Sequence, residues 1–166
     1  GRARGLRHIG NRALDSLRLE KSYGIWSTEF TQSTTPGMCG LDRHVAFDKG
    51  DFIGRDGALR ERDAPPARVL VTLAIDAVDA DASGFEPVKL DGRLVGYTTS
   101  GAYGHHVGRS LALAYVDREV VRDVADIGGG GSSAAAPPTV DVIGETRAAR
   151  LLREPVWDPK GLRIRA

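Results

Sequence analysis

The sequence predicts an α+β protein, in which a loop-rich N-terminal part with two helices precedes a set of antiparallel strands. Apolar residues recur at helical spacing near the start of the chain. After a Pro-Pro pair at residues 65–66, short segments with alternating apolar residues follow one another. Asp-Gly, a strong hairpin signal, separates two of these segments. About six such strands predict a small antiparallel barrel or sandwich.

Composition and charge restrict the class of protein. The chain has 166 residues, of which 41% are hydrophobic and 27% charged, as in an ordinary globular chain of one domain or two small ones. A net charge of +1 gives no overall basic field, so we expect neither nucleic acid nor a membrane as partner. The single cysteine, Cys39, excludes an internal disulfide and a cysteine-built zinc site. With no secretory signal visible, we expect a cytoplasmic protein, or one of the mitochondrial matrix if eukaryotic.

The first helix is predicted from residue 12 onward, with Asn11 as its N-cap and a stop near Gly24. Ala13, Leu17 and Glu20 fall on one side of this helix. Glu20 should therefore lie close to the face that packs. Because a buried, unpaired carboxylate is costly, Glu20 needs a donor partner.

Two kinds of partner remain open for Glu20. The first is a structural salt bridge with Arg12, Arg18 or Arg43, since ion pairs of this kind are common. The second is a flat heterocycle with two adjacent N–H donors, such as a pterin or a guanine, which a carboxylate accepts together. The residues by themselves favour the salt bridge.

Between the first helix and the strands, the chain reads as loops and short elements. Residues 27–37 are polar and end in Pro-Gly, which predicts a loop. Residues 44–47 form a short strand candidate, and a short helix is predicted through Ala58, with Asp56 as its cap. The change of composition at residues 63–66 is the best candidate for a domain boundary.

The strand region is predicted from alternation and turn signals. In the first strand Val69 and Val71 should face opposite to Leu70 and Thr72. Asp91-Gly92 should connect the second and third strands as a hairpin. The expected strands cover residues 68–75, 86–90, 93–100, 110–116, 139–144 and 147–157. The low-complexity segment 127–138 is expected to be a mobile loop without chemistry.

The familiar catalytic patterns do not fit this chain. The glycines of "GYTTSGAYGHHVG" are not framed by a strand-turn-helix unit, so a nucleotide-binding reading is weak. His105 and His106 are adjacent and in an extended segment point to opposite faces, which favours a surface role over a shared metal. Ser100 lacks the context of a nucleophile and an evident base. We therefore assign no catalytic residue and no metal ligand.

Four segments carry a family resemblance: "RALDSLRLEKSYGIWSTEFTQSTTPGMCGL", "DKGDFIGRDGAL", "DGRLVGYTTSGAYGHHVGRSLALAYV" and "EPVWDPKGLRIR". They resemble the aminomethyltransferase (T-protein) family of the glycine cleavage system. The details are most similar to the folate-binding C-terminal region of dimethylglycine and sarcosine dehydrogenases, where a T-protein-like module follows an FAD-dependent module. The resemblance implies a partial T-protein-like folate-binding domain over residues 1–63 and the C-terminal β-barrel of the T-protein over residues 66–166.

The resemblance also implies site residues. The Glu of the "LRLE" motif, here Glu20, would bind the pterin end of tetrahydrofolate. Lys49 matches a basic residue of the folate site, and Arg43 is the second candidate for that role. Tyr23 and Trp26 could supply a stacking surface by the chemistry of their rings, with packing as the equal alternative.

The function that the resemblance implies is transfer of a C1 unit from an amine to tetrahydrofolate. The family's catalytic Asp has no counterpart here, and FAD would belong only to an upstream module. The expected partners are folate, an amine-derived C1 donor, and an upstream FAD domain or partner chain. The alternative is a non-catalytic folate-binding regulatory protein, against which the absence of a Cys after Lys49-Gly50 counts. Because the sequence lacks an initiator Met, we expect a piece of a longer chain with exposed apolar surface.

Overall fold

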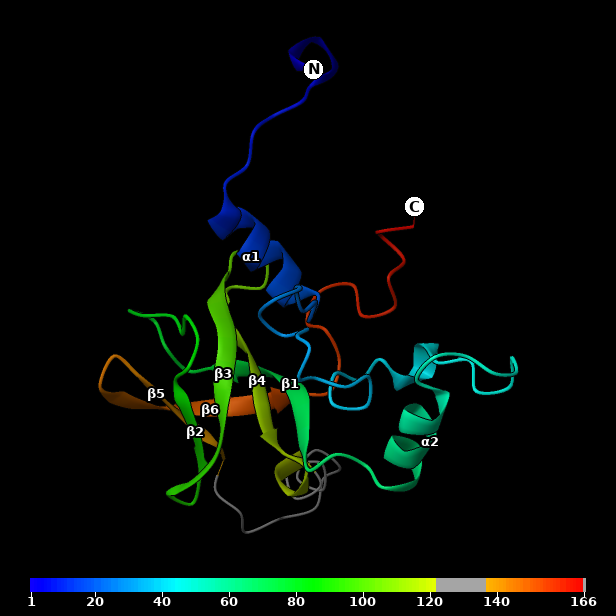
Figure 1. Cartoon of the computed structure of the whole chain (residues 1–166). Coiled ribbons are helices and arrows are strands. Elements are labelled where there is room, and N and C mark those ends of the chain that lie inside the picture. The colour runs from blue at the N-terminus through cyan, green and yellow to red at the C-terminus, as the bar shows by residue number, and fades with distance from the viewer. Residues whose placement is uncertain (122–136, 166) are drawn as a thin grey trace.

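The computed structural model describes residues 1–121 and 137–165 (Figure 1). Most of the segment 127–138, for which a mobile loop was predicted, lies outside the described residues. None of the helices in the described residues is long and apolar enough to cross a membrane. The elements, in chain order, are η1 (Arg2–Arg4), α1 (Asn11–Glu20), η2 (Asp42–His44), α2 (Arg55–Asp63), β1 (Arg68–Ile75), β2 (Pro87–Leu90), β3 (Arg93–Gly104), β4 (Arg109–Asp117), β5 (Thr139–Val142) and β6 (Glu145–Leu152).

The strands form a closed barrel in the order β1-β4-β3-β2-β5-β6 (Figure 1). Every neighbouring pair is antiparallel. Closure leaves no unpaired sheet edge, which removes the main route to unwanted strand pairing. The predicted α+β class is confirmed, and of the two predicted arrangements the barrel is the one formed.

The barrel interior is filled by alternate side chains of its strands. In β1, Val69 and Val71 pack against the interior cluster, whereas Leu70 packs on the opposite face. This confirms the predicted alternation of β1. The other interior side chains include Val88, Val95, Ala112, Ala114, Val116, Val140 and Val142. Burial of these apolar groups is the main favourable term in folding.

The predicted hairpin at Asp91-Gly92 is also confirmed. Asp91 has φ 50° and Gly92 has φ 77°, and their neighbours Leu90 and Arg93 pair across the turn. Positive φ at both central positions is the turn geometry that matches the twist of the two flanking strands. Glycine and aspartate adopt it more readily than other residues.

The ends of α1 differ from the prediction. Gly10, in extended conformation, is the N-cap, so Asn11 is the first helical residue and not the cap. The helix ends at Glu20, four residues before Gly24. Ser22 has φ 56°, and this left-handed conformation turns the chain out of the helix earlier than the expected glycine.

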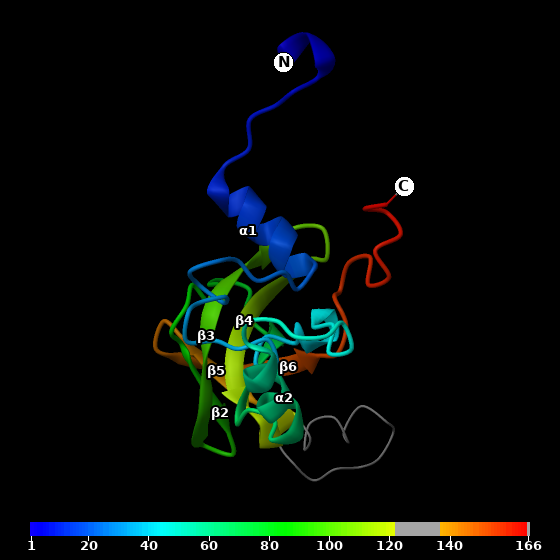
Figure 2. The ribbon, with the colours of Figure 1, turned by 45° about the vertical axis from the view of Figure 1, so that its right-hand side comes forward.

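Two further local predictions are wrong. Residues 44–47 contain the end of η2 and irregular chain, not a strand. Because the barrel is closed, a strand at this position would have no sheet edge to join. Helix α2 forms as predicted, but its N-cap is Gly54 at φ 90°, and Asp56 lies in the first turn. In Figure 2, α1 stands over one end of the barrel.

The packing face of α1 also differs from the predicted stripe. Glu20 is 2% exposed, as expected for the packing face. Its buried companions, however, are Ser16, Arg18 and Leu19, whereas Leu17 is 55% exposed and Ala13 is exposed. Ser16, Leu19 and Glu20 follow the i, i+3, i+4 spacing, so a helix face exists but is more polar than the one predicted.

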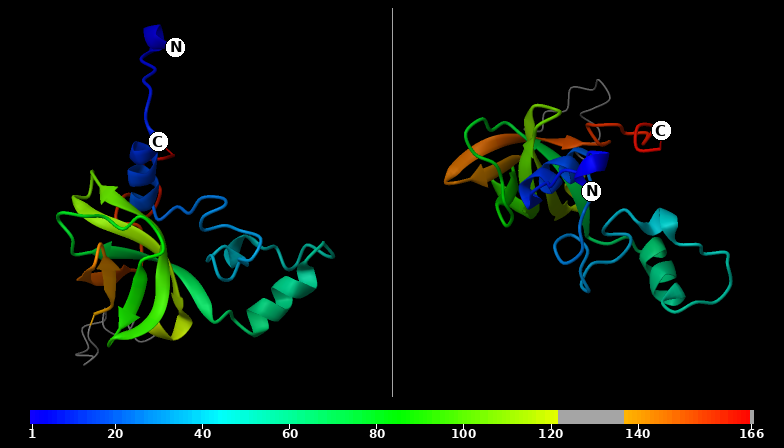
Figure 3. Two further views of the ribbon diagram at one scale, coloured as in Figure 1. Left: turned by 60° about the vertical axis from the view of Figure 1, so that its left-hand side comes forward. Right: turned by 90° about the horizontal axis from the view of Figure 1, so that it is seen from above.

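An exposed apolar surface was expected for the first part of the chain, and it is present. Leu6, Ile9, Leu14 and Leu17 are all exposed. They lie on α1 and on the segment before it, which extends away from the barrel in Figure 3. On the other side of α1, Leu19 packs with Leu111 and Leu113 of β4.

Candidate functional site

The carboxylate of Glu20 binds the turn between β3 and β4. Its Oε1 accepts the backbone N–H of His106 at 2.7 Å and that of Val107 at 3.2 Å. One turn earlier in α1, Ser16 Oγ accepts the backbone N–H of His105 at 3.2 Å. Backbone N–H groups of a tight turn have no strand partner, so the two side chains of α1 satisfy them. The end of α1 is thereby fixed on the hairpin.

Gly104 permits this close approach between α1 and the hairpin. A Cβ atom at Gly104 would lie 2.8 Å from Val107 Cγ2 and 3.1 Å from Glu20 Cγ. Both distances are shorter than ordinary van der Waals contact. The glycine of "GAYGHHVG" therefore has a steric role, and not the phosphate-binding role that glycine-rich stretches suggest.

Of the two partners considered for Glu20, the salt bridge is not formed in the described residues. Among the described residues Glu20 has no ion pair with Arg12, Arg18 or Arg43, because backbone N–H groups are its donors. Arg18 instead binds Asp15 Oδ1 at 2.9 Å. Both hydrogen bonds of the Glu20 carboxylate end on Oε1, and within the described part of the chain no donor binds Oε2. The lone pairs of Oε2 remain for another donor.

Glu29 is a second buried carboxylate, and sequence reasoning missed it. Its side chain is 0% exposed. Oε1 accepts the hydroxyls of Thr99 at 2.7 Å and Ser100 at 2.6 Å. Oε2 accepts the backbone N–H of Ile25 at 2.9 Å and lies 3.5 Å from Arg18 Nη1. Both oxygens of Glu29 are therefore occupied by donors of the protein.

A β-bulge makes the Glu29 arrangement possible. In the pairing of β3 with β4, Thr98 lies opposite Ala114 and Ser100 opposite Leu113, so Thr99 is an extra residue. Adjacent side chains of a regular strand point to opposite faces, whereas a bulge redirects them. Both hydroxyls therefore reach one carboxylate oxygen. Glu29 lies in an irregular loop, so its spacing from other residues in the sequence does not predict its burial. The sequence also carries no signal for the β-bulge.

The C-terminal segment is anchored on the end of α1. The N–H of Trp157 donates to the carbonyl oxygen of Glu20 at 3.2 Å. Lys21 Nζ donates to the carbonyl oxygen of Asp158 at 2.6 Å and lies 5.6 Å from the Trp157 ring. Tyr23 lies on the same ammonium group, with 5.7 Å between Nζ and its ring. Lys21 thus connects α1, Tyr23 and the C-terminal segment by a cation–π and hydrogen-bond cluster.

The side chain of Asp158 organises the last residues of the chain. Its carboxylate accepts the backbone N–H groups of Leu162, Arg163 and Ile164 at 2.8, 3.2 and 3.4 Å. Burial by itself would raise the pKa of Asp158, but these N–H donors and the charge of Lys21 outweigh it and lower the pKa. Asp158 is therefore a hydrogen-bonded anchor for the segment.

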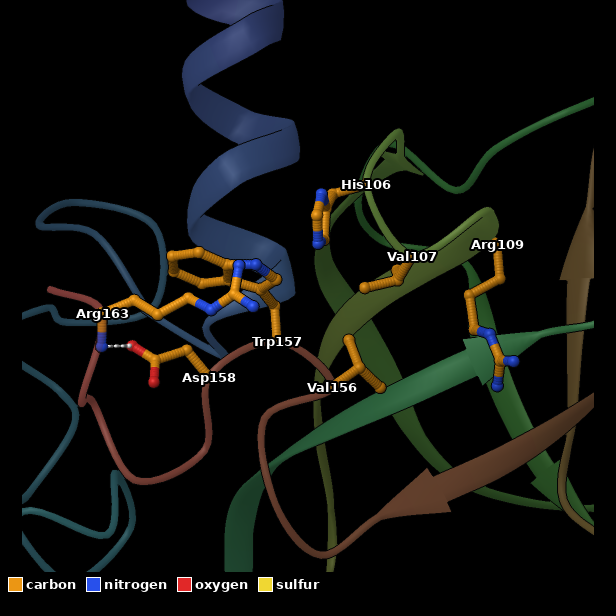
Figure 4. Close-up of a pocket in the computed structure, with 7 residues that line it drawn as sticks. All are labelled: His106, Val107, Arg109, Val156, Trp157, Asp158 and Arg163. Carbon is orange, nitrogen blue, oxygen red and sulfur yellow. Dashed lines mark hydrogen bonds between the residues drawn. The ribbon is translucent and has the colours of Figure 1, made fainter.

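A cavity of about 450 Å³ lies where the β3–β4 turn meets the C-terminal segment (Figure 4). We call it the Trp157 pocket. Its lining residues are His106, Val107, Arg109, Val156, Trp157, Asp158 and Arg163. The rings of His106 and Trp157 are nearly perpendicular, with 5.9 Å between their centroids. Two of the residues that line this pocket, His106 and Trp157, donate backbone hydrogen bonds to Glu20.

The other predicted site residues lie in different places. Trp26 is 72% exposed in the loop after α1. Arg43 donates to the Gly40 carbonyl at 3.1 Å and lines a second cavity of about 390 Å³ beside α2. Lys49 Nζ lies 5.0 Å from the Phe52 ring. No hydrogen bond or ion pair in the described residues joins Arg43 or Lys49 to Glu20, so only Tyr23 shares the Glu20 region, and all five assignments stay predictions.

Within residues 1–121 and 137–165, no group of three or more His, Cys, Asp or Glu could hold a metal ion. His105 packs its ring against Tyr103, with 5.2 Å between centroids, while His106 packs against Trp157. The two imidazoles therefore have separate aromatic partners. Ser100, which the sequence did not favour as a nucleophile, donates its hydroxyl hydrogen bond to Glu29.

Two family models match the chain in consecutive regions. The glycine cleavage T-protein C-terminal barrel domain matches residues 68–158, and the GCVT N-terminal domain matches residues 1–49. Among solved structures, the glycine cleavage system aminomethyltransferase T from Bartonella henselae has a TM-score of 0.69 and 22% identity. This comparison covers 89% of the present chain and 38% of that protein, and it supports the fold.

Similar sequences include two enzymes and one regulatory protein. Mitochondrial dimethylglycine dehydrogenase of Rattus norvegicus is 32% identical over 94% of this chain. An aminomethyltransferase of Streptomyces avermitilis is 40% identical over 70% of the chain. The mitochondrial pyruvate dehydrogenase phosphatase regulatory subunit of Mus musculus is 36% identical over 70%.

The chain spans only part of each of these relatives. It covers 17% of the dimethylglycine dehydrogenase, 32% of the aminomethyltransferase and 14% of the regulatory subunit. The barrel-domain model covers all of strands β1 to β6. The chain therefore belongs to the glycine cleavage T-protein family, and strands β1 to β6 form its C-terminal barrel.

Proposed function

We propose that this chain is the tetrahydrofolate-binding portion of a C1-transfer enzyme of the dimethylglycine or sarcosine dehydrogenase or the aminomethyltransferase type. In such an enzyme a C1 unit passes from an amine to tetrahydrofolate. The observation that carries the proposal is the Glu20 carboxylate, which is buried, fixed by two backbone N–H groups and free at Oε2 within the described residues.

The geometry of Glu20 suggests how a pterin would bind. Oε1 is occupied by His106 and Val107, so an arrangement with one pterin N–H on each oxygen would displace a backbone donor. Oε2 has two lone-pair sites and can accept adjacent N–H groups of one ring. The two backbone donors hold the carboxylate in one orientation, which reduces the entropy lost when a ligand binds.

The remaining site residues have weaker support. Tyr23 is 54% exposed and close to Lys21, so its ring offers a stacking surface beside Glu20. Trp26, Arg43 and Lys49 are proposed as folate contacts by the family resemblance, without a link to Glu20 in the described residues. FAD and the catalytic Asp would lie outside this chain. We expect residues 1–166 by themselves not to form 5,10-methylenetetrahydrofolate above the uncatalysed rate.

Glu20→Gln in the complete protein tests the proposal. The Gln side chain keeps an oxygen for His106 and Val107 but places an NH2 where Oε2 was, and that NH2 opposes the pterin N–H. We expect folate binding to weaken by roughly 2–4 kcal/mol, as measured by calorimetric titration with 5-formyltetrahydrofolate. Glu119→Gln, at an exposed position, is the matched control. Unchanged folate affinity in Glu20→Gln would contradict the proposal.

A second candidate function is that of a non-catalytic folate-binding regulatory protein. The similarity to a pyruvate dehydrogenase phosphatase regulatory subunit favours it. The two candidates differ in one measurement on the complete protein, which is formation of 5,10-methylenetetrahydrofolate from dimethylglycine or sarcosine. Folate binding without this product supports the regulatory function. The names of the dehydrogenase relatives also support a mitochondrial location if the protein is eukaryotic.

A further inference from the structure

Lys21 is a buried charge at the end of α1. The residue is 6% exposed and is the C-cap of the helix. A positive charge at this end of a helix is favoured by the helix dipole, but an ammonium group loses its hydration when it is buried. The contacts that replace this hydration show what the charge does in the folded protein.

The ammonium group of Lys21 joins the C-terminal segment to α1. Nζ donates to the carbonyl oxygen of Asp158 at 2.6 Å and lies 3.7 Å from Asp158 Oδ2. The preceding residue, Trp157, donates its backbone N–H to the carbonyl oxygen of Glu20 at 3.2 Å. Figure 4 shows Trp157 and Asp158 in succession below the end of the helix. Glu20 and Lys21 thus bind two consecutive residues of the segment.

Two aromatic rings share the same charge. Lys21 Nζ lies 5.7 Å from the centroid of the Tyr23 ring and 5.6 Å from that of the Trp157 ring. A cation at about this distance is attracted by the negative face of a ring. The two rings belong to different segments, one just after α1 and one near the C-terminus. A single charge therefore restrains both rings next to Glu20, its neighbour in the chain.

Asp158 does not depend on Lys21 for its hydrogen bonds. Its carboxylate accepts the backbone N–H groups of Leu162, Arg163 and Ile164. Removing one partner of a buried pair is costly mainly because the other charge is left uncompensated, and these three donors prevent that for Asp158. Stability therefore gives little reason for a charge at position 21, whereas the arrangement of the two rings and the segment does.

We propose that Lys21 is a positioning residue of the Glu20 site. Its ammonium group holds the two rings and the C-terminal segment in one arrangement beside the Glu20 carboxylate. Without the charge, a ligand would have to order these groups when it binds, and its affinity would fall. The effect on a ligand rests on the proposed function, whereas the arrangement of Trp157 can be measured without a ligand.

The experiment compares two substitutions of Lys21 in the complete protein. Lys21→Met keeps an unbranched side chain without the charge, and Lys21→Arg keeps the charge and can bind both a carbonyl and a ring. The protein is labelled with 5-fluorotryptophan, and the fluorine resonance of Trp157 is assigned by its absence in Trp157→Phe. We expect Lys21→Met to move or broaden this resonance, and Lys21→Arg to bring it back toward its position in the unmodified protein.

The same variants are titrated calorimetrically with 5-formyltetrahydrofolate. We expect Lys21→Met to weaken binding roughly tenfold, because the ligand must then order the rings and the segment. Lys21→Arg should recover most of this loss, which a merely space-filling role would not predict. Lys160→Met, at an exposed position of the same segment, is the matched control and should leave both the resonance and the affinity unchanged.

The outcomes separate the role of Lys21 from the proposed function. An unchanged Trp157 resonance or unchanged folate affinity in Lys21→Met would overturn the positioning role, and so would a Lys21→Arg protein that is equally impaired. If the unmodified protein does not bind folate, the proposed function is overturned, and the Trp157 resonance by itself supports or overturns the role of Lys21. If Lys21→Met does not fold, Lys21→Gln replaces it. Failure of both uncharged variants to fold would make Lys21 a residue of the fold and would overturn the proposal.

Discussion

Glu20 and Glu29 are both carboxylates buried between the N-terminal part of the chain and the β3–β4 hairpin, but they are bound in different ways. Glu29 accepts donors on both oxygens, from Thr99 and Ser100 on one and from Ile25 on the other. Glu20 accepts donors on Oε1 only, as far as the described residues show. Glu29 is therefore a carboxylate that stabilises the fold, whereas Glu20 keeps an oxygen, Oε2, that can accept hydrogen bonds from a ligand.

The loop that carries Glu29 is fastened to the barrel by more than its side chain. Tyr115 donates its hydroxyl to the Glu29 carbonyl oxygen at 2.8 Å, and its hydroxyl lies 3.1 Å from Cys39 Sγ. Burial, with a further contribution from Cys39, raises the pKa of Tyr115 above its ordinary value. Tyr115 therefore stays a neutral donor at physiological pH. A polar network of this kind stabilises only when each member is satisfied.

The largest effect in this comparison is expected for Glu29→Gln. The substitution removes the charge that faces Arg18 and places an NH2 near the N–H of Ile25 or near the two hydroxyls. Breaking a buried ion pair from one side typically costs about 3–5 kcal/mol. Denaturant unfolding should show a loss in this range. Glu119→Gln, at an exposed position, is the control and should change stability very little. If the Glu29→Gln protein were as stable as this control, Glu29 would not be a structural carboxylate.

The next effect is expected for Gly104→Ala. The new methyl group would meet Val107 and Glu20 side-chain atoms at 2.8 and 3.1 Å, so α1 or the hairpin must shift. Overpacking of this kind costs roughly 1–3 kcal/mol. Because the shift moves Glu20, folate affinity should fall together with the unfolding free energy. Loss of stability with unchanged folate affinity would show that Glu20 tolerates displacement and that the site lies elsewhere.

Ser100→Ala should have a smaller effect, because Thr99 still donates to Glu29 Oε1. Loss of one hydrogen bond costs about 1 kcal/mol. The double variant Ser100→Ala/Thr99→Val should cost more than the sum of the single variants, since it leaves Oε1 without a hydroxyl donor. A double-mutant cycle with chemical denaturation measures this coupling. Strict additivity would mean that the two hydroxyls do not share the carboxylate.

Apart from the exposed control, Glu20→Gln should affect folding least among the substitutions. Its remaining oxygen can accept His106 and Val107, so we expect a loss of unfolding free energy of about 1 kcal/mol or less. The same variant should lose much more free energy of folate binding. The contrast with Glu29→Gln is the sharpest test of the comparison. If Glu20→Gln destabilised the protein as strongly as Glu29→Gln, both carboxylates would be structural.

The smallest effect is expected from acid titration of Asp158. Its pKa is lowered in the folded protein, so its contribution to stability is complete above the ordinary carboxyl pKa of about 4 and decreases as the pH falls through the lowered value. Protonation of the Asp158 carboxylate weakens its hydrogen bonds with the backbone N–H groups of residues 162–164. Tryptophan fluorescence, followed from pH 6 to pH 2, should report loosening around Trp157. Asp158→Asn should abolish this step, and a step that persists in Asp158→Asn would come from another carboxyl group.

The sequence by itself determined the antiparallel strands and the burial of Glu20 in the first helix. Alternation in β1 and the Asp91-Gly92 turn are local patterns. They can be recognised without the rest of the fold, because side chains in a strand alternate with a period of two. The burial of Glu20 was also predicted, from helical spacing and a motif. Its predicted companions Ala13 and Leu17 were wrong, because the hairpin contacts a face with Ser16 and Leu19.

Only the tertiary structure decided what the buried carboxylates bind. The donors of Glu20 are backbone N–H groups 86 and 87 residues away in sequence, and every residue type except proline supplies such a group. Glu29 depends on a β-bulge, which depends on the pairing of β3 with β4 and not on residue spacing. The Trp157 pocket likewise unites the β3–β4 turn with the C-terminal segment. Patterns in a sequence record local geometry, whereas these sites arise from contacts between segments that only folding brings together.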